Sequence, residues 1–110
     1  MTFEDVIRLT SHLPGIEVGI SYGTPALRVG KKFMCRMWED GETMVLKPIE
    51  DIEQRFLMET QPGVFYLTPH YEGYPTVLIH LALVDEAELG DLIEQCWTRL
   101  ATPKLLKARA

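Results

Sequence analysis

The sequence predicts a single α+β domain, in which a mainly antiparallel β-sheet is covered on one face by helices from the two chain ends. Three observations predict it: helical apolar spacing near both termini, short β-type runs between them, and connections that are mostly tight turns and not crossover helices. The chain has 110 residues, of which 46% are hydrophobic, and this suits one domain, residues 1–110, with a real core. The other face of the sheet should stay partly open, and function would most easily lie there.

The N-terminal half is predicted to contain one helix and four strands. Thr2 is a suitable N-cap, with Asp5 three positions on, and helical spacing continues until Pro14-Gly15. Turn signals then separate β-type runs at residues 16–20, 26–29, 32–38 and 43–47. The Asp40-Gly41 pair predicts a hairpin between the last two runs.

The C-terminal half is predicted to contain two helices and a second pair of strands. Ile49, Ile52 and Phe56 recur at helical spacing and predict a helix over residues 49–60 with these side chains on its apolar face. The β-type runs 64–68 and 76–82 follow, joined by a loop at residues 69–75. Asp85 can cap a last helix ending near Pro103. Its apolar stripe consists of Leu89, Leu92, Ile93, Cys96 and Leu100.

The cysteines and the N-terminal residues indicate in which cellular compartment the protein is found. Cys35 and Cys96 are the only two cysteines, and we expect both to be free core thiols in a reducing environment. Strand alternation places Cys35 with Phe33 and Met37, opposite to Arg36. The N-terminus carries acids where a signal peptide needs basic residues, and no apolar run approaches the length of a membrane span. We therefore expect a cytoplasmic protein that does not bind membranes. The sequence does not indicate an oligomeric state, and we favour a monomer.

Several separated blocks of the sequence resemble one known family. They are SYGTPALRVGKKF at residues 21–33, LK at 46–47, FYLTPHYEGYP at 65–75, and a C-terminal helix with Trp97 before Pro103-Lys104. In this order they are similar to the MmcQ/YjbR family, and the similarity covers nearly the whole chain. The resemblance implies a CyaY-like, or double-wing, α+β domain and carries the family's DNA-binding label, which rests on fold analogy.

The same fold analogy extends to frataxin-like proteins, in which acidic residues bind iron. Here the acids gather near two predicted helix starts, as Glu50 and Asp51 and as Asp85, Glu86 and Glu88. The helix dipole accounts for acids at such positions without any metal. We therefore expect no metal site and no cofactor.

The distribution of charge along the chain provides a separate test of DNA binding. The net charge is −5, but residues 28–47 carry +2 and residues 99–110 carry +4, whereas residues 48–98 carry −9. In the nucleic-acid interpretation, five cations contact phosphates: Arg28, Lys31, Lys32, Arg36 and Lys47. Lys31 and Lys32 occupy a predicted hairpin tip. The alternative is that these cations are solvated and keep a sheet edge from pairing. Any DNA binding through them should be weak and salt-dependent.

A second candidate site consists of rings in the loop 69–75 and the strand before it. His70, Tyr71 and Tyr74 lie among two prolines and a glycine, which should hold the rings in place. They can stack on bases or line a small-molecule groove, and the alternative is that they complete the core.

The sequence contains none of the common catalytic motifs that we considered. The sequence has no phosphate-binding glycine loop, no zinc-protease motif, no nucleophile elbow and no Cys-x-x-Cys pair. We therefore expect a non-enzymatic binding module. The leading function is DNA binding through the basic hairpin patch, and the alternative is a small molecule or protein partner in the groove around His70 and Tyr71.

Overall fold

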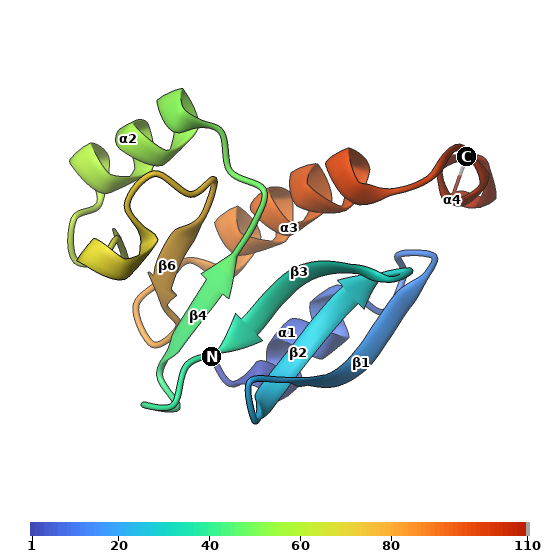
Figure 1. The fold of residues 1–110 in the computed structure, drawn as a ribbon, viewed down its shortest axis with the longest axis horizontal. Coiled ribbons are helices and arrows are strands. Elements are labelled where there is room, and N and C mark those ends of the chain that lie inside the picture. The colour runs from blue at the N-terminus through green and yellow to red at the C-terminus, as the bar shows by residue number, and fades with distance from the viewer. Residues whose placement is uncertain (110) are drawn as a thin grey trace.

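The computed structural model describes residues 1–109 and has an α+β architecture, as predicted (Figure 1). In chain order the elements are α1 (Phe3–Leu9), β1 (Ile16–Ser21), β2 (Thr24–Val29), β3 (Lys32–Met37), β4 (Thr43–Leu46), α2 (Asp51–Thr60), β5 (Phe65–Tyr66), the 3₁₀ helix η1 (Pro69–Tyr71), β6 (Val77–His80), α3 (Glu86–Leu100) and α4 (Pro103–Arg109). The strands form one sheet in the order β1-β2-β3-β4-β6-β5, and every pairing in it is antiparallel.

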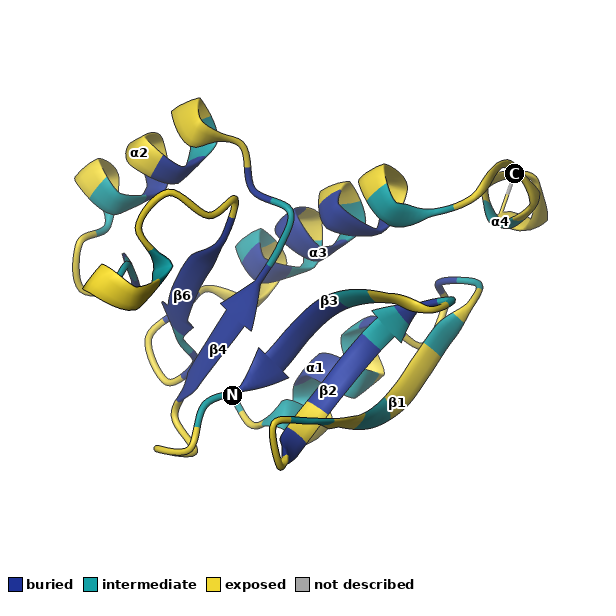
Figure 2. Ribbon diagram, in the orientation of Figure 1, coloured by how far each residue is buried: buried dark blue, intermediate teal, exposed yellow. Residues whose placement is uncertain are grey.

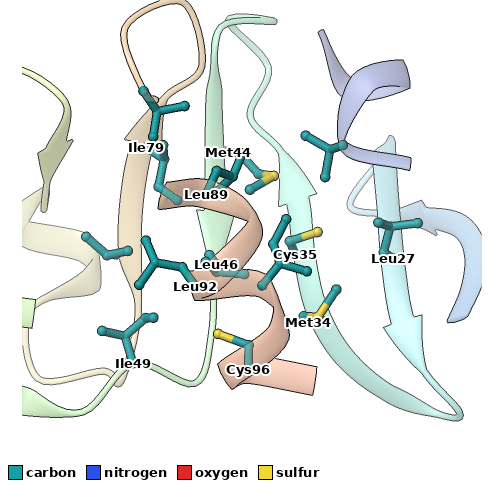
Figure 3. Close-up of a cluster of buried hydrophobic side chains, with 14 of the residues drawn as sticks. Leu27, Met34, Cys35, Met44, Leu46, Ile49, Ile79, Leu89, Leu92 and Cys96 are labelled. Carbon is teal, nitrogen blue, oxygen red and sulfur yellow. The ribbon is translucent and has the colours of Figure 1, made fainter. Parts of the chain in front are cut away.

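Helices from both chain ends cover one face of this sheet. Figure 1 shows α1 behind β2 and β3, and α3 behind β3 and β4. The core lies between these layers, and Figure 3 shows Leu89, Leu92 and Cys96 of α3 over side chains of the central strands such as Met34 and Leu46. Burial of this apolar surface stabilises the fold. Figure 2 shows the consequence in the strands: β4 and β6 are buried, whereas the edge strand β1 is largely exposed.

The first helix begins where the sequence predicts but ends earlier. The hydroxyl of Thr2 accepts from the Asp5 N–H at 3.3 Å, and the Asp5 carboxylate accepts from the Thr2 N–H at 2.8 Å, so both halves of a capping box are formed. The helix stops at Leu9, because the N–H of Thr10 is shared between the carbonyls of Val6 and Ile7 and the chain then turns.

The predicted apolar face of the second helix is wrong. Ile52 and Phe56 are 82% and 62% exposed, and Ile49 is buried but lies before the helix. The buried positions are Gln54 and Leu57. Gln54 turns inward because its Nε2 donates to the carbonyls of Tyr74 and Thr76, at 3.2 and 2.5 Å, which gives two backbone acceptors a partner. Because one of the two buried residues is polar, the buried face of α2 does not appear as an apolar stripe at helical spacing in the sequence.

Two other differences concern segments next to the site and at the C-terminus. The predicted strand 64–68 shortens to the two residues of β5, and the chain then turns into η1, where the Tyr71 N–H bonds to the Thr68 carbonyl at 2.9 Å. Beyond α3, the short helix α4 was not predicted. Its Leu105 packs against Gly15, and Arg109 lies over the Trp97 ring at 5.4 Å.

Candidate functional site

The open face of the sheet carries a hollow of about 650 Å³. Its walls are the β1–β2 turn, the strands β3 and β4, and the segment from η1 to the start of β6. Arg36 and Val45 are cross-strand partners that both line it, whereas their neighbours Cys35 and Met44 lie in the core on the opposite face. The lining residues are Ser21, Tyr22, Phe33, Arg36, Glu39, Val45, Lys47, His70, Tyr71, Tyr74, Pro75 and Thr76.

The hollow joins residues from two candidate groups that are separate in the sequence. Arg36 and Lys47 come from the predicted phosphate-binding set, and His70, Tyr71 and Tyr74 form the predicted ring set. The five meet because antiparallel pairing brings β3 and β4 side by side, and η1 then lies over the face that these strands expose. Two of the predicted cations and the three predicted rings therefore belong to one site.

Arg36 is buried and holds the hollow together. Its side chain is 10% exposed, and its Nη1 donates to the Thr24 hydroxyl at 3.2 Å and to the Met37 carbonyl at 3.1 Å. Nη1 also lies 3.5 Å from the Glu39 carboxylate, and Nη2 donates to the Tyr71 hydroxyl at 3.1 Å. The two N–H groups of Nη1 and one N–H of Nη2 are therefore engaged, whereas the Nε–H and the second N–H of Nη2 have no acceptor among the described residues. Its geometry makes it a structural support of the hollow.

Tyr71 is the ring that is held most firmly. Its hydroxyl is bonded to Arg36, and its ring meets that of His70 edge to face at a centroid distance of 5.0 Å. Trp38 lies against it at 6.3 Å, with the two ring planes tilted by 45°. Such aromatic pairs favour a defined arrangement over free rotation. His70 and Tyr74 remain exposed, the latter by 60%.

Lys47 is the available cation of the hollow. Its ammonium lies 5.7 Å from the centre of the Phe33 ring, and within residues 1–109 no carboxylate lies within 4.0 Å of it. A cation over a ring face is attracted by the ring quadrupole, which positions the ammonium without neutralising it. The ammonium of Lys47 is thus held in the hollow without a direct ion pair among these residues, and the acid of the lining, Glu39, lies beside Arg36.

Phe33 reaches the hollow through an irregularity that overturns the simple alternation of β3. Arg28 pairs with Phe33 and Leu27 with Cys35, so Met34 is an extra residue between the two pairs. A bulge of this kind shifts the facing of the residues on one side of it. Phe33 therefore lies on the open face, whereas Cys35 and Met37 are buried in the core, and the prediction that groups all three is wrong for Phe33.

The remaining cations of the predicted patch lie outside the hollow. Arg28 neighbours Phe33 across the β2–β3 ladder, and Lys31 and Lys32 occupy the tip of that hairpin, as predicted. Of the C-terminal cations, Arg99 pairs with Glu53 at 3.2 Å and Arg109 pairs with Glu94. The helix α4, which carries Lys104 and Lys107, lies near the hairpin tip, because its Leu105 packs against Gly15 and the Gly15 carbonyl accepts from the Gly30 N–H.

Sequence reasoning missed two rings of the site, Tyr22 and Phe33. Tyr22 stands in the turn between β1 and β2 with a φ of 52°, is 85% exposed, and has the Arg36 guanidinium 5.3 Å from its ring centre. Turn positions at φ > 0 are usually occupied by glycine or asparagine, so a tyrosine in such a tight turn is unusual. The Tyr-Gly pair between two β-type runs is therefore a pattern in the sequence that could have pointed to Tyr22. The bulge that places Phe33 leaves no such signal.

The cysteines are buried and outside the site. Burial raises the pKa of the Cys35 thiol well above its ordinary range and raises that of Cys96 to about 12. Both are therefore inert thiols at neutral pH. Within residues 1–109, no cluster of three or more His, Cys, Asp or Glu side chains is arranged to hold a metal ion. No helix in this part of the chain is long and apolar enough to cross a membrane.

Comparison with known proteins agrees with the resemblance. Two mycobacterial proteins, "Uncharacterized protein Mb2600" from Mycobacterium bovis and "Uncharacterized protein Rv2570" from Mycobacterium tuberculosis, are each 27% identical to the chain, over 97% of its length and 94% of theirs. The family model named YjbR matches residues 11–99, which include every residue that lines the hollow. The chain therefore belongs to the YjbR family.

Proposed function

We propose that this protein is a binding module whose open-face hollow takes a small organic anion that carries a planar ring. The observation that carries this proposal is Lys47, a cation that has no carboxylate within 4.0 Å in residues 1–109 and that is positioned on Phe33 inside a hollow walled by further rings. A volume of about 650 Å³ lies within the range of small-molecule sites. An anionic group would pair with the ammonium while the ring of the ligand lies against aromatic faces.

The rings differ in how they would serve such a ligand. Tyr71 is fixed by Arg36, His70 and Trp38, so it offers a rigid surface at little entropic cost on binding. Tyr22 and Tyr74 are exposed and free to close on a ligand from two sides. Stacking of a base or similar ring on one aromatic side chain contributes about 1–3 kcal/mol.

Binding without catalysis accords with the chemistry of the lining. Among the described lining residues, no hydroxyl is hydrogen-bonded to an imidazole or a carboxylate, which is the arrangement that activates a nucleophile. The lining supplies two cations, the carboxylate of Glu39 and several ring faces, and these groups suit the recognition of a charged ligand that carries a ring.

Single-stranded nucleic acid is the second candidate, and the hairpin β2–β3 favours it. Arg28, Lys31 and Lys32 have no carboxylate within 4.0 Å in the described part of the chain, and they continue from the corner of the hollow formed by Phe33 and Lys47. A nucleotide unit in the hollow would then have its neighbouring phosphates beside the hairpin tip. Arg36 is not part of this contact set, because its side chain is buried and is bonded to Thr24 and Tyr71.

A thermal-shift panel tests the first candidate. The panel contains nucleoside monophosphates, aromatic carboxylates and, as neutral probes, the matching nucleosides and amides. We expect charged members to raise the unfolding temperature of the wild type and to lose that effect in Lys47→Met, which keeps the aliphatic stem. Lys104→Met, on α4 and away from the hollow, is the matched control. Equal shifts in the wild type and Lys47→Met, or shifts by the neutral probes alone, would overturn the proposal.

A gel-shift series with labelled single-stranded and duplex oligonucleotides tests the second candidate. Binding of the single strand should weaken steeply with salt and should be lost in the double variant Lys31→Glu with Lys32→Glu. Retained binding in that variant, or a preference for duplex DNA, would contradict single-strand recognition by this face.

A further inference from the structure

The outermost strand of the sheet, β1, has a free backbone edge. The Gly30 N–H donates to the Gly15 carbonyl at 2.7 Å, and the ladder between β1 and β2 continues from that pair through Glu17 and Arg28. Antiparallel hydrogen-bonded pairs alternate along a strand, so the odd-numbered residues of β1 bond to β2. The N–H and carbonyl groups of Ile16, Val18 and Ile20 therefore point away from the sheet.

Nothing in the composition of β1 prevents another strand from pairing there. Val18 and Ile20 are 60% and 71% exposed, and Figure 2 shows this strand as the most exposed of the sheet. The strand IEVGIS contains neither lysine nor proline, the usual residues that block an edge, and its single charge is Glu17. An aliphatic edge of six residues without such protection favours strand addition.

The side chain of Arg28 extends toward this edge. Arg28 pairs with Glu17 in the ladder, but within residues 1–109 no carboxylate lies within 4.0 Å of its guanidinium. Its Nη1 lies instead over Gly19, 3.6 Å from where a Cβ would stand. Because Gly19 has no side chain, the guanidinium can lie over β1, and an acid from a strand added at the free edge could meet it there.

We propose that a second copy of this chain occupies the edge, with the two β1 strands antiparallel and a two-fold axis at Val18. In this register Val18 pairs with Val18 of the partner subunit, and Ile16 pairs with Ile20 of the partner subunit. Glu17 of the partner subunit then stands opposite Gly19, beside Arg28, and the symmetry repeats the ion pair. The one acid of the strand and the one cation at its edge thus complement each other across the axis.

The dimer would join the two sheets into one. A two-fold axis between antiparallel edge strands runs perpendicular to the sheet, so both hollows would open on the same side of the joined sheet. Arg28 would serve the interface and be unavailable to a ligand. This proposal replaces the monomer expected from the sequence and does not depend on what the hollow binds.

Sedimentation velocity over a range of protein concentrations tests the proposal. The wild type should shift from monomer to dimer as concentration rises, and Val18→Lys should remain monomeric, since it places two like charges at the axis. Val18 is exposed, so the variant should keep its circular dichroism spectrum and melting temperature. Ile52→Lys, which changes another exposed aliphatic residue, on α2, is the matched control and should dimerise as the wild type does. A wild type that is monomeric throughout would overturn the proposal.

A charge exchange tests the register. Glu17→Arg and Arg28→Glu should each weaken dimerisation, and the double variant should restore it, because the pair is then reversed on both sides of the axis. If the double variant stays as weak as the single ones, or if neither single variant changes the dimer, the Val18-centred register is wrong. Amide exchange provides an independent readout, since the Val18 and Ile20 amides should become protected only at dimer-forming concentrations.

Discussion

Arg36 and Tyr71, 35 positions apart, are joined by a hydrogen bond of 3.1 Å from the guanidinium to the phenol. The bond attaches η1 to the middle of the sheet and fixes the ring that faces the hollow. It is also a polar contact made almost out of water, since the Arg36 side chain is 10% exposed. Contacts of this kind are costly to break on one side only.

Arg36→Met should lower the free energy of unfolding by about 3 kcal/mol, because a charged hub with several partners is lost. Tyr71→Phe removes only the hydroxyl and should cost about 1 kcal/mol. Urea unfolding of both variants and of the double variant measures the coupling between them. If the two losses are simply additive, the hydrogen bond does not contribute to stability.

Asp40 should make the stability of the protein depend on pH at the acidic end. Partial burial raises its pKa, but hydrogen bonds from the backbone N–H groups of Glu42 and Thr43 and from the Thr43 hydroxyl outweigh this and hold the pKa below 3.8. The carboxylate therefore stabilises the folded state at neutral pH, and this contribution is lost as pH falls through the lowered value.

Asp40→Asn should show a smaller difference in unfolding midpoint between neutral and acidic pH than the wild type does. Asp91→Asn, which changes an exposed carboxylate on α3, is the control. An unchanged pH profile in the Asp40 variant would show that this hairpin does not set the acid sensitivity.

Thr76→Val should stabilise the protein by about 1 kcal/mol, since it removes a buried hydroxyl that lacks a partner. The Oγ1 atom of Thr76 is buried and makes no hydrogen bond with any described protein atom. Thr24→Val is the matched opposite case, because the Thr24 hydroxyl donates to the Ser21 carbonyl at 2.8 Å and accepts from Arg36. Thermal unfolding should move in opposite directions for the two variants, and a loss of stability in Thr76→Val would refute the assignment.

The two thiols should resist modification in the folded protein. Cys35 and Cys96 are both 0% exposed, and burial raises the pKa of each, that of Cys96 to about 12. A colorimetric thiol reagent should react slowly with the native protein at mildly alkaline pH and rapidly with both cysteines after denaturation. Rapid reaction of one equivalent before unfolding would show that a cysteine is accessible.

The elements that the sequence predicts correctly are those with strong local signals. The cap at Thr2, the stripe of α3 and the turns between the first four strands each act over a few residues, and the structure confirms them. The errors arise where tertiary contacts override local pattern. Gln54 turns inward to satisfy two distant carbonyls, and the extra residue Met34 moves Phe33 to the other face of the sheet.

Sequence reasoning found five residues of the candidate site, Arg36, Lys47, His70, Tyr71 and Tyr74, but it missed Tyr22 and Phe33 and did not show that these residues share one hollow. The cations of β3 and β4 and the rings of residues 70–74 were each visible as a group in the sequence. Nothing local indicated that Arg36 supports Tyr71, or that Lys47 has no carboxylate beside it in the described residues. Both facts depend on which strand lies next to which, and that is a property of the whole fold.

The two tryptophans are in very different surroundings, and this gives the protein an optical probe of its own. Trp97 is 1% exposed and its indole N–H is bonded to the Pro14 carbonyl at 2.8 Å, so its fluorescence should change little when the open face is occupied. Trp38 is half-buried behind Tyr71, the ring that faces the hollow. Emission changes during a titration can therefore be assigned to Trp38, and binding can be followed without attaching a dye.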